Sequence, residues 1–317
     1  MAGRKGPEFV SSFFGSRELN SRTGLRLATE DHLWDFLAES TVRTQVKNPA
    51  LSRIEAATEP GPLLFRGQVQ ESFGISSSLY RFIQDETQIG VSESLLFEIE
   101  QKIIEVAKSR GLGKGMPDGH LLMLLQHYGI PTRLIDVSTG PLEALYFATE
   151  HRDASDGRLF IFKLIDRDGW VSRRDLDGTE LPWVKKPGSY WTEEVSVVEP
   201  LALDPRMGAQ GSKFLVGGII RASADRNIQY GEHNNFLDKD ELPQITTLSI
   251  CFPKRSPGVV RTPWHAIGWS VRIPAAWKAS LRERLAGVGI SRDSMYPPFA
   301  SVQWAATAAA RDYISSL

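Results

Sequence analysis

Two short apolar runs constrain what this chain can fold into. Residues 158–164 read RLFIFKL and residues 214–220 read FLVGGII. Each run has the length of a strand rather than of a typical helix, and its apolar residues do not alternate strictly with polar ones. Such runs are typical of strands that are covered on both faces, so they predict a buried β-sheet. A third buried strand is expected at residues 63–65 (LLF), directly after a Pro-Gly-Pro turn.

Segments with helical spacing separate these strands. In the clearest one, Ser92 is a candidate N-cap, apolar residues recur at helical spacing from Leu95 to Ala107, and Gly111 ends the helix. The same reasoning predicts further helices at residues 29–44, 118–127, from Pro141, 274–287, and over the Ala-rich stretch 301–313. Strands and helices together predict an α+β protein with a helical C-terminal end.

The organisation of the chain is expected to be simple. A chain of 317 residues is long enough to bury a substantial core in one large domain. Residues 1–30 are polar and of mixed charge, which predicts a flexible N-terminal arm, and the charged, Gly-containing stretch 166–192 predicts a long surface excursion. No repeat or low-complexity linker divides the remainder, so we expect residues 31–317 to form a single domain with a C-terminal helical extension.

Charge and cysteine content narrow the partners and the compartment. With 37 basic and 38 acidic residues, the chain has no overall attraction to nucleic acid or to an anionic membrane. Cys251 is the single cysteine, which excludes an intramolecular disulfide, and its alternating apolar surroundings predict a buried, inert thiol. No apolar run approaches the roughly 18 residues of a membrane helix, and the N-terminus lacks a signal-peptide pattern. We therefore expect a cytoplasmic protein with no membrane partner.

The standard chemical motifs are missing from the sequence. It has no GxxxxGK loop, HExxH helix, CxxC pair or GxSxG elbow, and its six histidines lack metal-ligand spacing, so no metal is expected. The unusual segment is 126–148, QHYGIPTRLIDVSTGPLEALYFA, which sets His127, Thr132, Arg133 and Asp136 among apolar residues. Buried polar groups need partners. Either Arg133 and Asp136 pair with neighbours to hold the turns, or these polar residues form a site.

Two further segments are candidates for the same site. Arg66 follows a predicted buried strand, and Gly67 after it would let the backbone approach a ligand while the guanidinium grips phosphate or carboxylate. Gln210 precedes a second predicted strand, so its side chain would project at that strand's mouth. The alternative for Gln210 is a turn with a capping amide.

These three segments, in this order, resemble the FRG-domain family, named for the tripeptide present here at residues 65–67. The family's longest motif, approximately QHYG-PTRLLDWT-SP--ALYFA, is similar to residues 126–148, with Val-Ser in place of the usual Trp-Thr. Its later Arg…Ala-Gln-x-Gly-x-Phe stretch is similar to residues 206–214. Its closing motif is similar to residues 289–297, with Tyr296 in place of Phe. The resemblance spans about residues 60–300, so the single domain is expected to be an FRG domain.

The order of the motifs also looks like that of ADP-ribosyltransferases. That likeness implies a split, strongly twisted β-sheet core flanked by helices, with NAD bound in its cleft. By this analogy Arg66 grips NAD phosphate or ribose next to Gly67, and the middle motif brings Thr132 and Asp136 to the nicotinamide side. His127 and Arg133 line the same pocket.

The analogy places Gln210 where those enzymes carry a catalytic Glu. A glutamine cannot act as a general base, whereas a glutamate can hold a ribose hydroxyl and stabilise an oxocarbenium-like transition state. Either another acid supplies this role, or the site binds without transferring. The candidate acids are Asp136, Glu194, Glu199 and Glu232.

The resemblance implies a bacterial toxin or anti-phage effector. Such a protein would use NAD as substrate, modify a macromolecular acceptor such as RNA or DNA, and have an antitoxin protein as a further partner. Two alternatives stay open. One is a nuclease that cuts RNA or DNA, with His127 as acid or base and Arg66 and Arg133 stabilising phosphate charge. The other is a non-catalytic module that senses a nucleotide.

Overall fold

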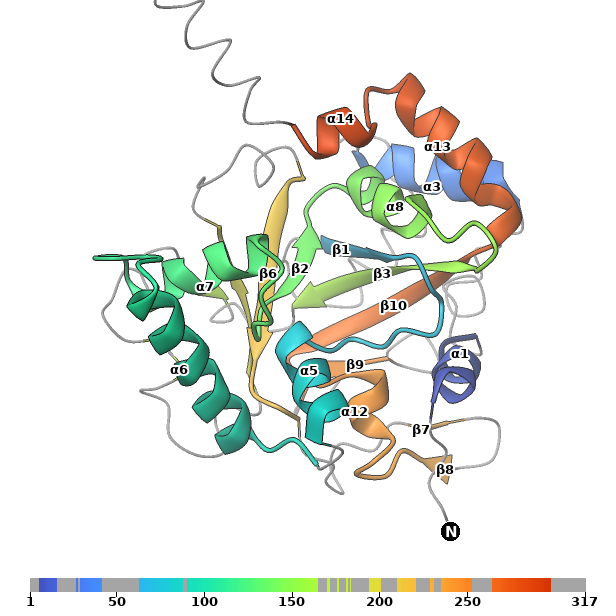
Figure 1. Ribbon diagram of the computed structural model, residues 1–317. Helices are drawn as coiled ribbons and strands as arrows, with labels where there is room; N and C mark the ends of the chain where they lie inside the picture. Colours follow the sequence, from blue (N-terminus) through green and yellow to red (C-terminus); the bar gives the residue numbers. More distant parts are fainter. Residues whose placement is uncertain are drawn as a thin grey trace, which may run out of the picture.

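The computed structural model describes residues 6–15, 27, 29–41, 63–87, 90–164, 170–171, 176, 181, 183, 194–200, 210–220, 229–230, 235–252 and 264–297 (Figure 1). Within this part of the chain, helices pack on both faces of one large mixed sheet, which confirms the predicted α+β class. The predicted helix at 301–313 lies outside the described residues. No described helix has the length and apolar character needed to cross a membrane.

The sheet has eight described strands in the order β4-β5-β6-β2-β1-β3-β10-β9. In chain order, the bounds are β1 Leu63–Gln68, β2 Ile135–Ser138, β3 Gly157–Leu164, β4 Trp170–Val171, β5 Val195–Val198, β6 Ser212–Gly217, β9 Ile250–Cys251 and β10 Ala266–Ile273. A separate pair consists of β7 Gln229–Tyr230 and β8 Asn235–Phe236. The three strands predicted from apolar runs are β1, β3 and β6. Strand β1 lies at the centre, antiparallel to both β2 and β3.

Strand β3 shows why its sequence is apolar throughout. It is buried along its whole length between β1 and β10. Phe160 and Phe162 pack into one core cluster, whereas Leu159 and Ile161 pack into the cluster on the opposite face. Because successive side chains point to opposite faces, a strand covered on both sides needs apolar residues at odd and even positions alike.

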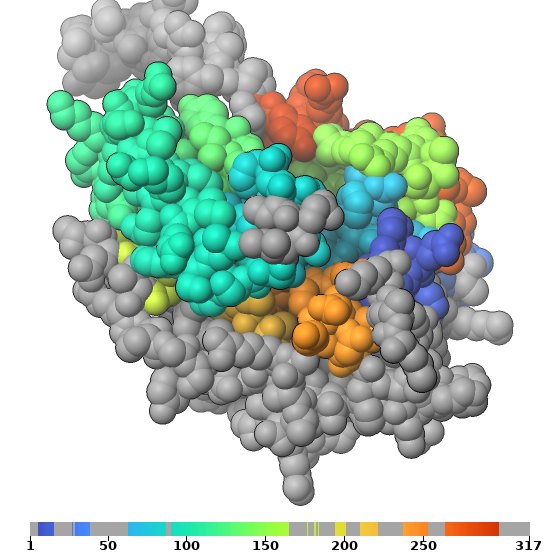
Figure 2. Space-filling view, turned by 60° about the horizontal axis from the view of Figure 1, so that its bottom comes forward, coloured from blue at the N-terminus to red at the C-terminus, as the bar shows by residue number. Residues whose placement is uncertain are grey.

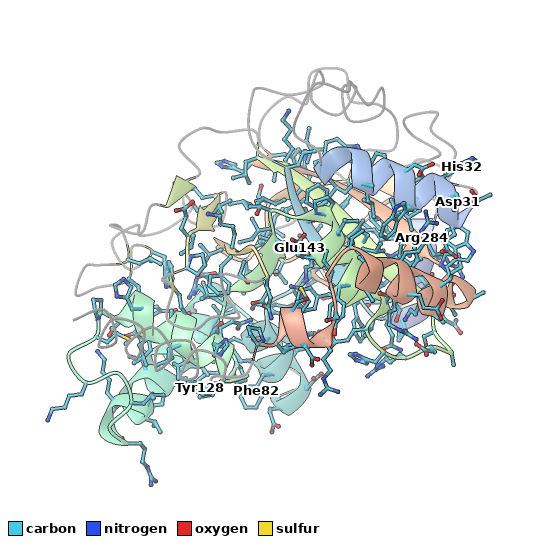
Figure 3. All side chains as sticks on the ribbon, turned by 90° about the horizontal axis from the view of Figure 1, so that it is seen from above. Asp31, His32, Phe82, Tyr128, Glu143 and Arg284 are labelled. Carbon is cyan, nitrogen blue, oxygen red and sulfur yellow. The ribbon has the colours of Figure 1, made fainter. Side chains whose placement is uncertain are left out.

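Three helices cover the second of these faces: α3 (Glu30–Thr41), α8 (Pro141–Thr149) and α13 (Lys278–Gly287), the last preceded by η4 (Ala275–Trp277) (Figure 1). Leu33, Phe36 and Leu37 are buried from α3, as predicted. Arg284 of α13 bonds Asp31 of α3 at 2.6 Å, and the two residues lie together at the rim of this layer (Figure 3).

Helix α1 (Pro7–Gly15) belongs to the core on the other face. Phe13 and Phe14 are fully buried, and the Phe14 ring contacts the rings of Phe160 and Phe252 at centroid distances of 5.0 and 5.1 Å. The predicted flexible arm over residues 1–30 is therefore wrong for this helix, because its apolar face is needed to cover β3. The short helix α12 (Leu242–Ile245) packs in the same cluster, next to α1.

The third group of helices covers the end of the sheet formed by β5 and β6. Helix α6 (Glu93–Ser109) begins at the predicted cap, with the Ser92 hydroxyl accepting from the Leu95 amide at 3.2 Å. Helix α7 (Asp118–His127) packs beside α6. Helix α5 (Ser78–Thr87) lies between β1 and α6 in the chain and also contacts α6 (Figure 1). Within the predicted surface excursion 166–192, the described Leu176, Leu181 and Trp183 are buried against α6 and α7. This part of the stretch thus contributes to the core.

Candidate functional site

A cleft of about 720 Å³ runs along the second half of β1. Residues from α1, α5, α12, β2 and α8 also line it. Figure 2 views the face on which α1 (dark blue), α5 (cyan) and α12 (orange) border this cleft. Five predicted site residues line it, namely Arg66, Gly67, His127, Asp136 and Gln210. Thr132 and Arg133 do not, because both are buried elsewhere.

The strand order explains why the three sequence motifs meet. Strands β1, β2 and β6 are neighbours, with Phe65 paired to Ser138 and Ser138 paired to Ser212. Arg66 comes from β1, Asp136 from β2, and Gln210 from the turn just before β6. Segments that lie far apart in the sequence therefore present their polar residues at one place in the sheet.

Arg66 is the most enclosed charge in the cleft. The side chain of Arg66 is 17% exposed. Its Nη1 donates to the Asp136 carbonyl at 2.5 Å and lies 3.9 Å from Asp136 Oδ2. Its Nε is buried and has no hydrogen-bond partner among the described residues. Burial lowers the pKa of Arg66, although Asp136 opposes this shift. A buried guanidinium with a free donor is suited to bind an anion.

Arg81 adds a second guanidinium that the sequence did not single out. It lies on α5, lines the cleft, and donates from Nη1 to the Ser76 carbonyl at 2.5 Å. It is close enough to Arg66 for its charge to lower the pKa of Arg66 further. Two arginines facing one cleft can share a doubly charged group such as a pyrophosphate. No motif marks Arg81, because its place depends on how α5 packs.

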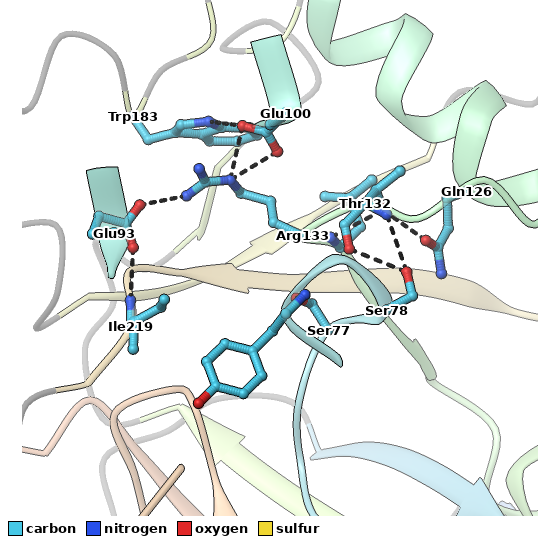
Figure 4. A network of polar contacts seen from close by, with 11 residues as sticks. Ser77, Ser78, Glu93, Glu100, Gln126, Thr132, Arg133, Trp183 and Ile219 are labelled. Carbon is cyan, nitrogen blue, oxygen red and sulfur yellow. Dashed lines mark hydrogen bonds and ion pairs between the residues drawn. The ribbon is translucent and has the colours of Figure 1, made fainter. Parts of the chain in front are cut away.

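Asp136 is held in place by a relay of side chains, of which Gln126, Thr132 and Ser78 are shown in Figure 4. Gln126 donates from Nε2 to Asp136 Oδ2 at 2.7 Å and accepts at Oε1 from the Thr132 hydroxyl at 2.6 Å. Thr132 is in turn fixed by its amide, which donates to Ser78 Oγ at 3.0 Å. Thr132 therefore positions Gln126, and through it Asp136. Thr132 was predicted to line the pocket, but it is buried behind Gln126 and does not line the cleft.

Arg133 points away from the cleft into a buried ion-pair cluster (Figure 4). Its Nε donates to both oxygens of Glu100 at 2.8 and 3.0 Å, and Nη1 donates to Glu93 at 2.8 Å. Trp183 also donates to Glu100 at 3.0 Å, and its ring lies 5.0 Å from the guanidinium. Burial raises the pKa of Glu100, and Arg133 opposes that shift. Arg133 is not available to a ligand, which agrees with the structural interpretation of its motif.

Gly67 is required by packing between β1 and α8. A Cβ at this position would lie 1.8 Å from the Ala144 carbonyl oxygen and 2.6 Å from the Ala148 nitrogen. The glycine thus lets the ALYFA helix lie directly on the strand that carries Arg66. The sequence had suggested that the backbone approaches a ligand here, whereas the close approach is to a helix.

Gln210 serves as a structural amide at the rim. Its side-chain Nε2 donates to the Met295 backbone carbonyl at 2.9 Å, and the backbone carbonyl of Gln210 accepts from Ser138 Oγ at 2.8 Å. It thereby ties the turn before β6 to the end of helix α14 (Arg292–Met295). This geometry fits the alternative of a turn with a capping amide.

Acidic residues of the cleft are Asp136 and, unexpectedly, Glu150. Glu194 and Glu199 do not line it, and Glu199 instead pairs with Lys213. Glu232 lies outside the described residues. Glu150 stands two positions after the ALYFA motif, at the C-cap of α8, so this position was the available sequence signal. Among the described residues, no group of three or more His, Cys, Asp or Glu is arranged to hold a metal ion.

Comparison with known proteins supports one part of the sequence resemblance. Residues 61–157 match the model of the FRG domain. The matched segment contains Arg66, His127, Asp136 and Glu150, whereas Gln210 and Tyr296 lie beyond it. A search of curated proteins found no match. A search of solved structures found none either.

Proposed function

We propose that this protein transfers ADP-ribose from NAD to a macromolecule, in the toxin or anti-phage setting that the FRG resemblance implies. The observation that carries the proposal is the meeting of three motif residues, Arg66, Asp136 and Gln210, from adjoining parts of the sheet around one cleft. This is the arrangement expected if the motif order matches that of ADP-ribosyltransferases.

The cleft suits a dinucleotide in size and charge. Ligand pockets commonly measure about 300–1,000 Å³, and this one is about 720 Å³. Arg66 and Arg81 supply two guanidiniums for the pyrophosphate, and the buried, unpartnered Nε of Arg66 is a donor that a phosphate oxygen would satisfy. Phe65 and Phe147 add apolar lining that an aromatic base or nicotinamide ring could contact.

Asp136 is placed to orient the ribose. Gln126 and Arg66 fix its carboxylate at the edge of the cleft, where 56% of its side chain remains exposed. A fixed carboxylate can accept hydrogen bonds from ribose hydroxyls and favour positive charge that develops on the sugar as nicotinamide leaves. His127, at the end of α7, and His151 line the same space and add two imidazoles to it.

The test is a transfer assay with NAD labelled in its adenylate phosphate. Wild type, Arg66→Ala and a control, Glu199→Gln, which changes a carboxylate outside the cleft, are incubated with cell extract, RNA and DNA. We expect wild type and the control to label one class of macromolecule, and Arg66→Ala to leave it unlabelled while remaining folded by circular dichroism. Intact NAD and no labelled product with wild type would refute the proposal.

A nuclease is the second candidate, because His127 shares the cleft with Arg66 and Arg81. An imidazole can move protons to and from the oxygens of a phosphodiester while guanidiniums stabilise its developing charge. In the same assay this activity would appear as cleavage of RNA or DNA without NAD, and it would be lost in His127→Ala. Binding of a nucleotide without any turnover would instead favour the non-catalytic sensing module.

A further inference from the structure

We propose that Glu150 is the catalytic carboxylate of this site, and that Tyr296 and Gln210 position it. The inference rests on the proposed transfer of ADP-ribose and assigns the acid that the sequence left open. It starts from a second polar group in the cleft, distinct from the Arg66–Asp136 pair, at the end of helix α8.

The two acids of the cleft, Asp136 and Glu150, differ in how far neighbouring groups compensate the negative charge of the carboxylate. Asp136 Oδ2 accepts from Gln126 and lies 3.9 Å from Arg66, so a cation offsets its charge. Glu150 Oε2 accepts from the Tyr296 hydroxyl at 3.2 Å and lies 3.8 Å from His151 Nδ1. Its Oε1 has no hydrogen-bond partner in the part of the chain that the structure describes. Glu150 is also the more enclosed, with 25% of its side chain exposed.

Tyr296 is built to hold Glu150 in one orientation. Its ring packs against the rings of Tyr146 and Phe147, each at a centroid distance of 6.4 Å. Burial and the nearby Glu150 charge raise the pKa of Tyr296, so its hydroxyl stays protonated and donates.

Gln210 fixes the segment that carries Tyr296. Its Nε2 donates to the carbonyl of Met295, the residue directly before Tyr296, at 2.9 Å. A capping box at Ser291 stabilises the N-terminus of helix α14. A glutamate at position 210 would lose this donor and place a carboxylate against a carbonyl oxygen. An amide at this position is therefore explained if the catalytic acid stands elsewhere and Gln210 supports it.

In the proposed transfer, Glu150 acts as the general base. The bond from ribose C1′ to the nicotinamide nitrogen breaks, and its electron pair leaves with nicotinamide. The Glu150 carboxylate stabilises the positive charge that develops on the ribose. A nucleophilic oxygen or nitrogen of the acceptor bonds to C1′, and its proton passes to Oε1 of Glu150, which then releases it to water.

The experiment measures kcat of ADP-ribose transfer and the Kd for NAD separately for wild type and four variants. The variants are Glu150→Gln, Tyr296→Phe, Gln210→Glu and the control Glu199→Gln. Removal of a general base typically costs about 10²–10⁴-fold in rate. We expect kcat of Glu150→Gln to fall by about that factor, with the Kd for NAD from calorimetry changed less than about threefold. Tyr296→Phe should lose about tenfold in kcat, as for one hydrogen bond to a charged group. Gln210→Glu should be slower than wild type.

Each outcome decides something different. If wild type transfers no ADP-ribose, the proposed function is refuted and this assignment with it. If wild type is active and Glu150→Gln retains its kcat, or Gln210→Glu is faster than wild type, only the assignment of Glu150 is refuted. Should Glu150→Gln fail to fold, Glu150→Asp and Tyr296→Phe test the same point, because a loss of kcat without a change in Kd is not expected from a purely structural role.

Discussion

Replacing Arg133 by methionine separates a structural arginine from a ligand-binding one. Methionine keeps most of the aliphatic stem but removes the guanidinium that bonds Glu93 and Glu100. Because the side chains of Arg133 and Glu100 are each 1% exposed, the variant leaves an uncompensated carboxylate in the core. Breaking such a pair from one side typically costs about 3–5 kcal/mol. At roughly 2 °C per kcal/mol for a chain of this size, the unfolding midpoint should fall by about 6–10 °C.

The same variant should show a characteristic dependence on pH. Loss of Arg133 removes a charge that lowers the pKa of Glu100, so burial raises that pKa further above its unfolded value. The folded variant then binds a proton that the unfolded chain releases, and lower pH stabilises the variant relative to wild type. Thermal unfolding followed by circular dichroism at about pH 8 and about pH 5.5 should show a smaller deficit at the lower pH.

A second substitution provides the matched control for this reasoning. Glu100→Gln in the Arg133→Met background removes the stranded charge and should recover part of the lost stability. An Arg133→Met variant with wild-type stability that no longer binds nucleotide would refute the structural assignment. It would return Arg133 to the ligand site predicted from the sequence.

Three further substitutions test other parts of the account. Phe14→Ala should destabilise the protein by about 3–5 kcal/mol in chemical denaturation, because α1 belongs to the core, whereas an unchanged midpoint would support a loose arm. Gly67→Ala should destabilise it by about 3 kcal/mol, since its Cβ meets backbone atoms of α8, and near-neutral behaviour would contradict that packing. Gln126→Leu should weaken transfer activity more than stability because it releases Asp136, and full activity would show that the relay is dispensable.

Local patterns predicted the elements that depend on local chemistry. The apolar run of β3, the Ser92 cap of α6 and the start of α8 at Pro141 are all found where they were expected. Helix α1 was missed, although Phe9 and Phe13 stand four residues apart, as on one face of a helix. The surrounding charges made that short segment look like a solvated arm.

The candidate site divides in the same way. Arg66, His127, Asp136 and Gln210 come together because their motifs adjoin neighbouring strands, which a resemblance can anticipate. Arg133 could not be assigned from sequence, because its partner Glu100 is 33 positions away on α6. Arg81 carries no motif, and Glu150 is marked only by its position two residues after ALYFA. They reach the cleft only through the tertiary packing of α5 and of the end of α8, which no local pattern encodes.

The most direct test of the central claim is calorimetric titration of NAD into wild type, Arg66→Ala and Arg133→Met, at a temperature where all three are folded. A hydrogen bond to a charged group is worth about 1.5–3 kcal/mol, which corresponds to about a 10–150-fold change in Kd. We predict saturable binding to wild type, binding weaker by that factor in Arg66→Ala, and wild-type affinity in Arg133→Met. Absence of NAD binding to wild type, or equal affinity in wild type and Arg66→Ala, would contradict the assignment of this cleft as an NAD site anchored by Arg66.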